Sequence, residues 1–237
     1  MNTGWIPQTL TLGNLTCGFL SLIYASQRSS EGSVVAAILI LIAALLDGMD
    51  GEVARRLGVS TPLGKELDSL SDCVTFGIAP GFLAYQNYLA GLNLSLASYS
   101  VDLGILIAAV FPICAAYRLA RFNVQSPPGA FSGLPSPMAG ILVALLHLSF
   151  QTAPIPGPVF AIIFLLAGLL MVSTVTYLKP QAHILKNLNG LKLAGLIILF
   201  TLLLVRFGFR ILFLLVAVYV LSGLLGYVIK TIEEHRY

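Results

Sequence analysis

Eight apolar stretches, each close to the length of one bilayer crossing, make up most of this chain. A membrane-spanning helix needs roughly 20 mainly apolar residues. The stretches cover residues 8–26, 34–57, 66–90, 101–123, 136–153, 157–178, 190–206 and 209–230. Only 10% of the 237 residues are charged, whereas about 25% are charged in a soluble domain. Because backbone amides in lipid must pair within their own segment, the sequence predicts an all-α, polytopic integral membrane helix bundle.

The exact number of spans stays open between six and eight. The stretch 136–153 is short, and the region 190–230 can fold in more than one way. If the N-terminus is cytoplasmic, ten of the 13 lysine and arginine residues fall on the cytoplasmic side. Cytoplasmic loops retain positive charge, so both termini are predicted to be cytoplasmic. The net charge of +3 comes from these residues and does not indicate a nucleic-acid partner.

Acidic residues are concentrated where the second apolar stretch ends and the third begins. Six of the ten lie between positions 47 and 72. Helix residues three or four apart share a face, so Asp47, Asp50 and Arg55 form one stripe and Asp68 and Asp72 another. The short connection makes these stripes antiparallel neighbours. Carboxylates at membrane depth are costly unless cations offset their charge. Oxygen-only ligands suit Mg²⁺, Mn²⁺ or Ca²⁺, so the sequence predicts two divalent cations bound by the four aspartates.

Small residues accompany these acids. Gly48, Gly51, Ala54 and Gly64 leave the helix backbone open to a flat, phosphate-bearing ligand. Arg55, one turn after Gly51, can bind a phosphate through charge-assisted hydrogen bonds. Paired metals, an arginine and a floor of small residues suit a nucleoside diphosphate ester, with displacement at phosphorus.

Two other interpretations of the acids remain. Intramembrane aspartate and glycine also serve helix packing, which explains one or two such residues. Acids in the membrane also mark the ion path of a divalent-cation or proton-coupled transporter. A transporter has no need for a floor of small residues.

The run D-x2-D-G-x2-A-R-x8-G-x3-D-x3-D, from Asp47 to Asp72, resembles the signature of the CDP-alcohol phosphatidyltransferase family at all eight positions. Members transfer a phosphatidyl group from a CDP-linked lipid to an alcohol and release CMP. The resemblance implies that Asp47, Asp50 and Asp68 ligate two divalent metals, Mg or Mn, with Ca as a further possible binder. It implies that Asp72 completes the metal site and serves as the catalytic base. The residues that it implies for CDP binding are Gly51, Ala54, Arg55 and Gly64.

Four further segments resemble the bacterial and archaeal phosphatidylserine synthase branch of this family. They are I-P-Q-T-L-T-L-G-N-L-T-C-G-F at 6–19, Y-R-L-A-R-F-N-V at 117–124, F-S-G-L-P-S-P at 131–137 and L-M-V-S-T-V-T-Y-L-K at 170–179. The first segment adds Thr11 and Asn14 as candidate CDP contacts. The resemblance implies CDP-diacylglycerol and L-serine as substrates. It also implies a homodimer. The loop charges predict that the active site faces the cytoplasm from the cell membrane. We expect a single domain over 1–237, with a catalytic core at about 6–180 and a C-terminal helical hairpin at about 190–230.

An amino-acid acceptor needs its own binding residues. Serine carries a carboxylate, which an arginine can bind with two parallel hydrogen bonds. Arg118 and Arg121 lie three positions apart at the cytoplasmic end of the fourth stretch, close to Asn123. We expect one of the two arginines to bind the carboxylate. Phosphorylated acceptors such as glycerol phosphate or inositol phosphate stay as alternatives, but they need a denser basic pocket than this chain offers.

Overall fold

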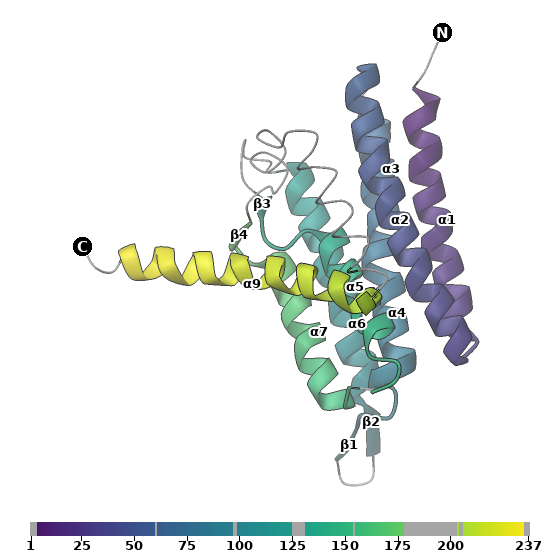
Figure 1. The fold of residues 1–237 in the computed structure, drawn as a ribbon, viewed down its shortest axis with the longest axis vertical. Helices are drawn as coiled ribbons and strands as arrows, with labels where there is room; N and C mark the ends of the chain where they lie inside the picture. The colour runs from purple at the N-terminus through teal and green to yellow at the C-terminus, as the bar shows by residue number, and fades with distance from the viewer. Residues whose placement is uncertain are drawn as a thin grey trace.

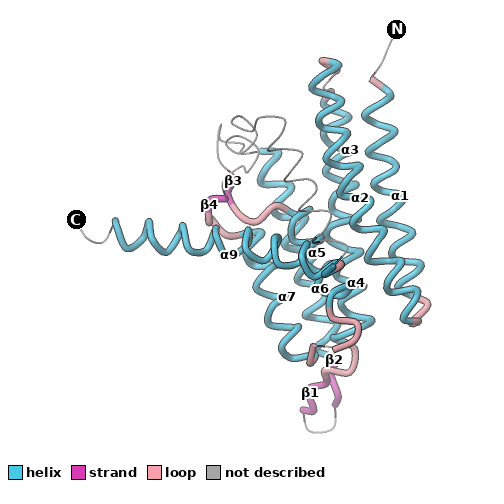
Figure 2. Tube along the Cα trace, in the orientation of Figure 1, coloured by secondary structure: helices cyan, strands magenta, loops and turns pink. Residues whose placement is uncertain are grey.

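The computed structural model describes residues 4–59, 61–96, 99–124, 131–153, 155–177, 203 and 206–234. Within these ranges the chain is almost entirely helical, which confirms the all-α class (Figure 2). The α-helices are α1 (Trp5–Ser26), α2 (Ser30–Leu57), α3 (Pro62–Asp72), α4 (Ala79–Ala84), α5 (Leu103–Val124), α6 (Ser136–Ser149), α7 (Gly157–Val172) and α9 (Phe209–Glu234). Two antiparallel strand pairs connect helices: β1 (Asn93–Leu96) with β2 (Tyr99–Asp102), and β3 (Phe131–Ser132) with β4 (Thr176–Tyr177).

The third predicted stretch is one continuous helical run, but it is not a uniform α-helix. The π-helical segment η1 (Cys73–Ile78) joins α3 to α4, and a second one, η2 (Tyr85–Leu89), follows α4. η1 begins directly after Asp72. Short π segments inside helices often lie at functional sites. The apolar pattern predicted the extent of this run, but neither the π segments nor the β1–β2 hairpin.

Among the described residues, three helices are long and apolar enough to cross a membrane: α2, α5 and the part Phe209–Val228 of α9. α6 and α7 are shorter apolar helices of 14 and 16 residues. This agrees with a membrane helix bundle, while the count of six to eight spans stays a prediction. The first half of the expected C-terminal hairpin, residues 190–202, lies outside the described residues.

The long helices run side by side, with one exception (Figure 1). α1 packs along α2 and against α3, and α5 packs on η1 and α7. The start of α1 and the α2–α3 connection lie at one end of the bundle, and the β1–β2 hairpin lies at the other. α9 instead crosses the bundle at a steep angle and packs on α6 and β4. The apolar pattern predicted the α9 helix but did not predict its crossing direction.

α1 carries an unusually polar buried stripe for a membrane helix. Its buried residues are spaced alternately four and three apart: Pro7, Thr11, Asn14, Gly18, Ser21 and Ala25. The Ser21 hydroxyl donates to the Ala36 carbonyl, 2.9 Å away. A Cβ on Gly18 would overlap the side chain of Thr75, so this glycine lets α1 and η1 approach closely. The stripe therefore brings Thr11 and Asn14 against the acidic helix ends.

Residues on either side of position 60 fix the end of α2 and the start of α3. Gly58 has a φ of 64°, the left-handed conformation in which glycine commonly ends a helix. The Thr61 hydroxyl accepts a hydrogen bond from the Gly64 N–H, 3.0 Å away, and Pro62 occupies the first helical turn. The two acidic stripes are thereby held as antiparallel neighbours, as the short spacing predicted.

Candidate metal and nucleotide site

The four aspartates meet between α2 and α3. Carboxylate oxygens of Asp47, Asp50 and Asp68 all lie within 4.8 Å of one another. The Asp47 carboxyl also lies within hydrogen-bonding reach of those of Asp68 and Asp72. Asp50 and Asp72 are buried, with 5% and 6% of their surface exposed. The fold thus brings together all four residues that the sequence predicted as one cluster.

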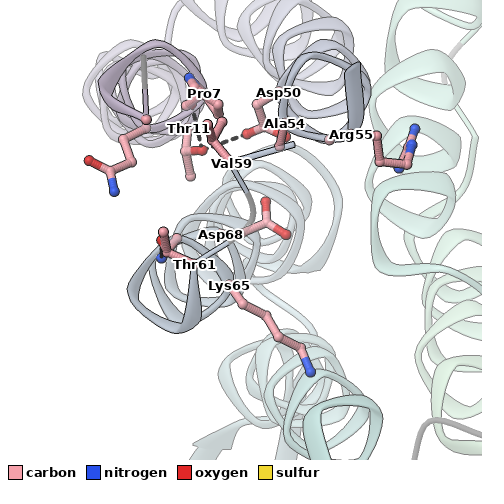
Figure 3. Close-up of a pocket in the computed structure, with 13 residues that line it drawn as sticks. Pro7, Thr11, Asp50, Ala54, Arg55, Val59, Thr61, Lys65 and Asp68 are labelled. Carbon is pink, nitrogen blue, oxygen red and sulfur yellow. Dashed lines mark hydrogen bonds between the residues drawn. The ribbon is translucent and has the colours of Figure 1, made fainter. Parts of the chain in front are cut away.

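Residues of α1 hold two of these carboxylates in place. The Thr11 hydroxyl donates to Asp50 Oδ2 at 2.6 Å, as Figure 3 shows, and Asn14 Nδ2 donates to Asp72 Oδ1 at 3.3 Å. The hydroxyls of Ser71 and Thr75 donate in turn to the backbone carbonyls of Thr11 and Asn14. Both α1 residues were expected as CDP contacts, but the structure places their donors on carboxylates. Such hydrogen bonds orient ligand groups around a metal.

In the part of the chain that the structure describes, no lysine or arginine forms an ion pair with these four aspartates. Among the described residues, the ion pairs of lysine and arginine involve Glu52, which contacts Arg55 and Arg56 at 2.9 and 2.8 Å. Asp68 Oδ1 is buried without a hydrogen-bond partner in that part of the chain. Buried polar atoms rarely stay unpaired, and converging carboxylates repel one another. This set of hard oxygen donors therefore fits divalent cations such as Mg²⁺ or Mn²⁺.

A cavity of about 220 Å³ adjoins the aspartates. Its walls come from α1, α2 and the start of α3 (Figure 3). Four residues predicted to bind CDP line it, namely Gly51, Ala54, Arg55 and Gly64, and so does Thr11. The sequence did not indicate Pro7, Val59 or Lys65, which also line it. Gly48, predicted as part of the same floor, is not among the lining residues.

The glycines of α2 differ from those that serve helix contacts. A Cβ on Gly48 would meet no atom within 4 Å, and one on Gly51 would lie 3.4 Å from only the tip of Arg55. A Cβ on Gly140, by contrast, would lie 3.2 Å from the Phe76 backbone. Helix packing therefore explains Gly140 but not Gly51. The missing side chain at Gly51 leaves space for a ligand rather than for a neighbouring helix.

Arg55 stands at the edge of this cavity. Its side chain is 71% exposed and pairs with Glu52. Figure 3 shows it extending away from Thr11 and Asp68. A long, exposed side chain is free to change rotamer, so the guanidinium can exchange Glu52 for a phosphate.

Comparison with known proteins identifies this arrangement. A sequence model of CDP-alcohol phosphatidyltransferase matches residues 4–176. The chain belongs to this family. A CDP-diacylglycerol–serine O-phosphatidyltransferase of Bacillus subtilis (strain 168) is 38% identical over 191 residues, covering 78% of this chain and 97% of the relative. An enzyme of the same name from Helicobacter pylori (strain ATCC 700392 / 26695) is 36% identical over 178 residues, covering 72% and 70%. An archaetidylserine synthase of Methanothermobacter thermautotrophicus is 35% identical over 179 residues, covering 73% and 69%.

The two arginines expected at the acceptor site of this phosphatidyltransferase have different environments. Arg118 is 6% exposed, and its Nη1 donates to the Ser136 hydroxyl at 3.0 Å. Its Nε has no hydrogen-bond partner within the described ranges, and its guanidinium lies in electrostatic range of Asp72. Arg121 instead donates to the carbonyls of Val172 and Ser173, at 2.9 and 3.2 Å. Arg121 therefore stabilises the C-terminal end of α7, whereas Arg118 is buried against the start of α6.

Asn123, the third residue expected at the acceptor site, is hydrogen-bonded to the protein. Its Nδ2 donates to the Ser69 hydroxyl at 2.9 Å, which joins the end of α5 to α3 next to Asp68. Ser136, the partner of Arg118, lies in the segment 131–137, which resembles the phosphatidylserine synthase branch. The sequence did not predict that Ser136 contacts Arg118. Its role follows from the packing of α6 against α5, which apolar periodicity does not specify.

Proposed function

We propose that this phosphatidyltransferase transfers the phosphatidyl group of CDP-diacylglycerol to the hydroxyl of L-serine, giving phosphatidylserine and CMP. The observation that carries the proposal is a cluster of four carboxylates, two of which, Asp50 and Asp68, line a cavity where a Cβ on Gly51 would approach only the tip of Arg55. The names of the relatives support serine as the acceptor. The buried, incompletely paired Arg118 near Asp72 supports an acceptor with one carboxylate.

Asp47, Asp50, Asp68 and Asp72 would hold two divalent metal ions, Mg or Mn. When bound, such a pair neutralises a diphosphate and stabilises the attacking and leaving oxygens of a displacement at phosphorus. Thr11 and Asn14 hold Asp50 and Asp72 in orientation through the hydrogen bonds of the buried α1 stripe. Preorganised ligands of this kind lower the reorganisation needed during the reaction.

The remaining residues bind and orient the two substrates. The CDP portion enters the cavity along Gly51, Ala54 and Gly64, with its phosphates within reach of Arg55 after a rotamer change. The acyl chains stay in the bilayer. Arg118 binds the serine carboxylate with two hydrogen bonds. This anchoring directs the serine hydroxyl toward the carboxylates.

Asp72 takes the proton as the serine oxygen attacks. The new bond joins this oxygen to the lipid-side phosphorus, and the bond from that phosphorus to the CMP oxygen breaks. Asn14, fully buried, keeps Asp72 oriented for this transfer. Positioning two reactants in this way supplies a large share of the rate enhancement.

The protein's setting follows from the same reasoning. We place it as a homodimer in the cell membrane, with both termini and the active site on the cytoplasmic side. The end of the bundle that carries the aspartates also carries Arg55, Arg56 and Lys65, in agreement with the positive-inside pattern. The domain assignment is one integral unit over 1–237 with its catalytic core at about 6–180.

The test is CMP release by the purified protein. CDP-diacylglycerol and Mn²⁺ or Mg²⁺ are incubated with serine, glycerol phosphate, inositol phosphate or no alcohol. The proposal predicts that CMP is released only when serine is the alcohol, and that phosphatidylserine forms in an equal amount. Release of CMP with a phosphorylated alcohol instead of serine would show that this alcohol is the acceptor. No release with any alcohol would overturn the enzymic function in favour of a cation transporter.

A further inference from the structure

Glu52 lies on α2 between the aspartate stripe and the end of the helix. It follows Asp50 by two positions, so the helix turns it to a different face from the aspartates. Its carboxylate pairs with two arginines of the last turn of α2: Oε2 lies 2.9 Å from Arg55 Nη2, and Oε1 lies 2.8 Å from Arg56 Nε. Of these three residues, Arg55 lines the cavity beside the aspartates, whereas Glu52 and Arg56 do not.

The ion pair with Glu52 fixes the direction of the Arg55 side chain. Figure 3 shows this side chain extending away from Thr11 and Asp68, although Arg55 lines the same cavity as they do. The Nη2 atom that donates to Glu52 is also one of the donors that a phosphate in the cavity would use. Carboxylate and phosphate oxygens both suit the planar N–H pairs of a guanidinium. A phosphate in the cavity therefore competes with Glu52 for Arg55.

The second arginine makes this competition mild. Each oxygen of Glu52 binds one arginine, so Glu52 stays paired with Arg56 when Arg55 turns toward a phosphate. The side chains of Arg55, Arg56 and Glu52 are 71%, 77% and 46% exposed, so water solvates the charges during the exchange. Exposed ion pairs of this kind are weak. The pair therefore lowers the affinity for a phosphate by a small factor and does not block the cavity.

We propose that Glu52 is a positioning residue that competes with the diphosphate of CDP-diacylglycerol for Arg55 and so weakens binding of the donor. This inference rests on the proposed function, in which Arg55 reaches the phosphates after a rotamer change. Glu52 offers the guanidinium an alternative partner on the outer side of α2, and Arg56 keeps the Glu52 carboxylate in place for it. The affinity for the nucleotide is thereby set by a residue that does not line the cavity.

The experiment measures CDP binding by calorimetry, with Mg²⁺ present and at low salt, in wild type and Glu52→Gln. Glutamine keeps the shape of the side chain and removes its charge. The Kd for CDP should fall about 1.5- to fivefold, the worth of one exposed ion pair. The KM for CDP-diacylglycerol should fall with it, and the KM for serine should not change. A purely structural role predicts the opposite sign, because losing both ion pairs loosens the end of α2.

Glu66→Gln is the matched control for net charge. It removes one exposed acid from the neighbouring helix α3 and should leave the CDP affinity unchanged. A double-mutant cycle isolates Arg55. In an Arg55→Ala background, Glu52→Gln should also leave the CDP affinity unchanged, because no guanidinium remains for which the two anions compete. Thermal unfolding of each variant checks that the protein stays folded.

Three results would overturn the role of Glu52 and leave the proposed function intact. The first is an unchanged or weakened CDP affinity in folded Glu52→Gln. The second is an equal gain in the Arg55→Ala background, which would show that Glu52 repels CDP directly. The third is an equal gain in Glu66→Gln, which would assign the effect to net charge. A wild-type protein that binds no CDP and releases no CMP with any alcohol would end the proposed function, and this inference with it.

Discussion

The variant Gly51→Ala tests whether Gly51 leaves room for a ligand or for a neighbouring helix. The two roles predict opposite changes in stability and activity. Gly51 lies inside α2, and a Cβ there would approach only the flexible tip of Arg55, at 3.4 Å. Replacing a mid-helix glycine by alanine stabilises by about 0.5–1 kcal/mol when the site has room. The unfolding midpoint should therefore rise by about 1–4 °C. The same methyl group enters the space assigned to CDP, where overpacking costs about 1–3 kcal/mol, or about five- to 150-fold in affinity.

Two glycines of the same chain serve as controls. Gly48→Ala meets no atom within 4 Å and lies outside the cavity lining, so it should show the stability gain without loss of substrate affinity. Gly18→Ala places its Cβ 2.9 Å from the Thr75 Cα, so it should destabilise by about 1–3 kcal/mol. The assays are thermal unfolding in detergent and CMP release against CDP-diacylglycerol concentration. A Gly51→Ala protein that is less stable than wild type, or that keeps the wild-type KM for the lipid, would refute the reasoning.

Four further variants test the proton transfer, the acceptor site, the end of α7 and the support of a metal ligand. Asp72→Asn should abolish CMP release while CDP-lipid binding, measured by calorimetry, remains. Arg118→Ala should raise the serine KM at least about 30-fold, since removing one partner of a buried charge pair costs about 2–5 kcal/mol. Arg121→Ala should instead lower the unfolding midpoint, because the carbonyls at the end of α7 lose their donor. Thr11→Val removes the 2.6 Å bond to Asp50, so the Mn²⁺ affinity should fall about ten- to 100-fold.

For each of these variants, one result would contradict the role assigned to the residue. Full turnover in Asp72→Asn would exclude that residue as the base. If Arg121→Ala, rather than Arg118→Ala, raised the serine KM, then Arg121 and not Arg118 would bind the serine carboxylate. Unchanged Mn²⁺ affinity in Thr11→Val would show that the hydroxyl does not orient a metal ligand.

Much of the fold and the acidic site could be predicted because the governing rules are local. Apolar length defines a membrane helix, and a spacing of three or four defines its face, so Asp47, Asp50, Asp68 and Asp72 could be grouped before any coordinates. The short α2–α3 connection, ended by Gly58 and capped by Thr61, left few other ways to pair the two stripes. All four residues meet in the structure.

The rest depends on tertiary packing that no local pattern contains. Thr11 and Asn14 were expected at the nucleotide; Thr11 lines the cavity, and both side chains also donate to carboxylates, which the sequence did not predict. Arg118 and Arg121 look equivalent in sequence and are separated only by what α6 and α7 bring near them. α9 packs on α6 and β4, where the Tyr177 hydroxyl donates to the carbonyl of Val220, 43 positions later in the chain.

The most direct test of the central claim is electron paramagnetic resonance of Mn²⁺ bound to the purified protein in the presence of CDP-diacylglycerol. The account predicts about two Mn²⁺ per chain with a spin-coupled spectrum, since paired metals in such sites lie about 3.5–4 Å apart. Asp47→Asn should remove the coupling, because the Asp47 carboxyl lies within hydrogen-bonding reach of those of Asp68 and Asp72. Binding of no Mn²⁺, or of isolated and uncoupled ions that persist in Asp47→Asn, would contradict it.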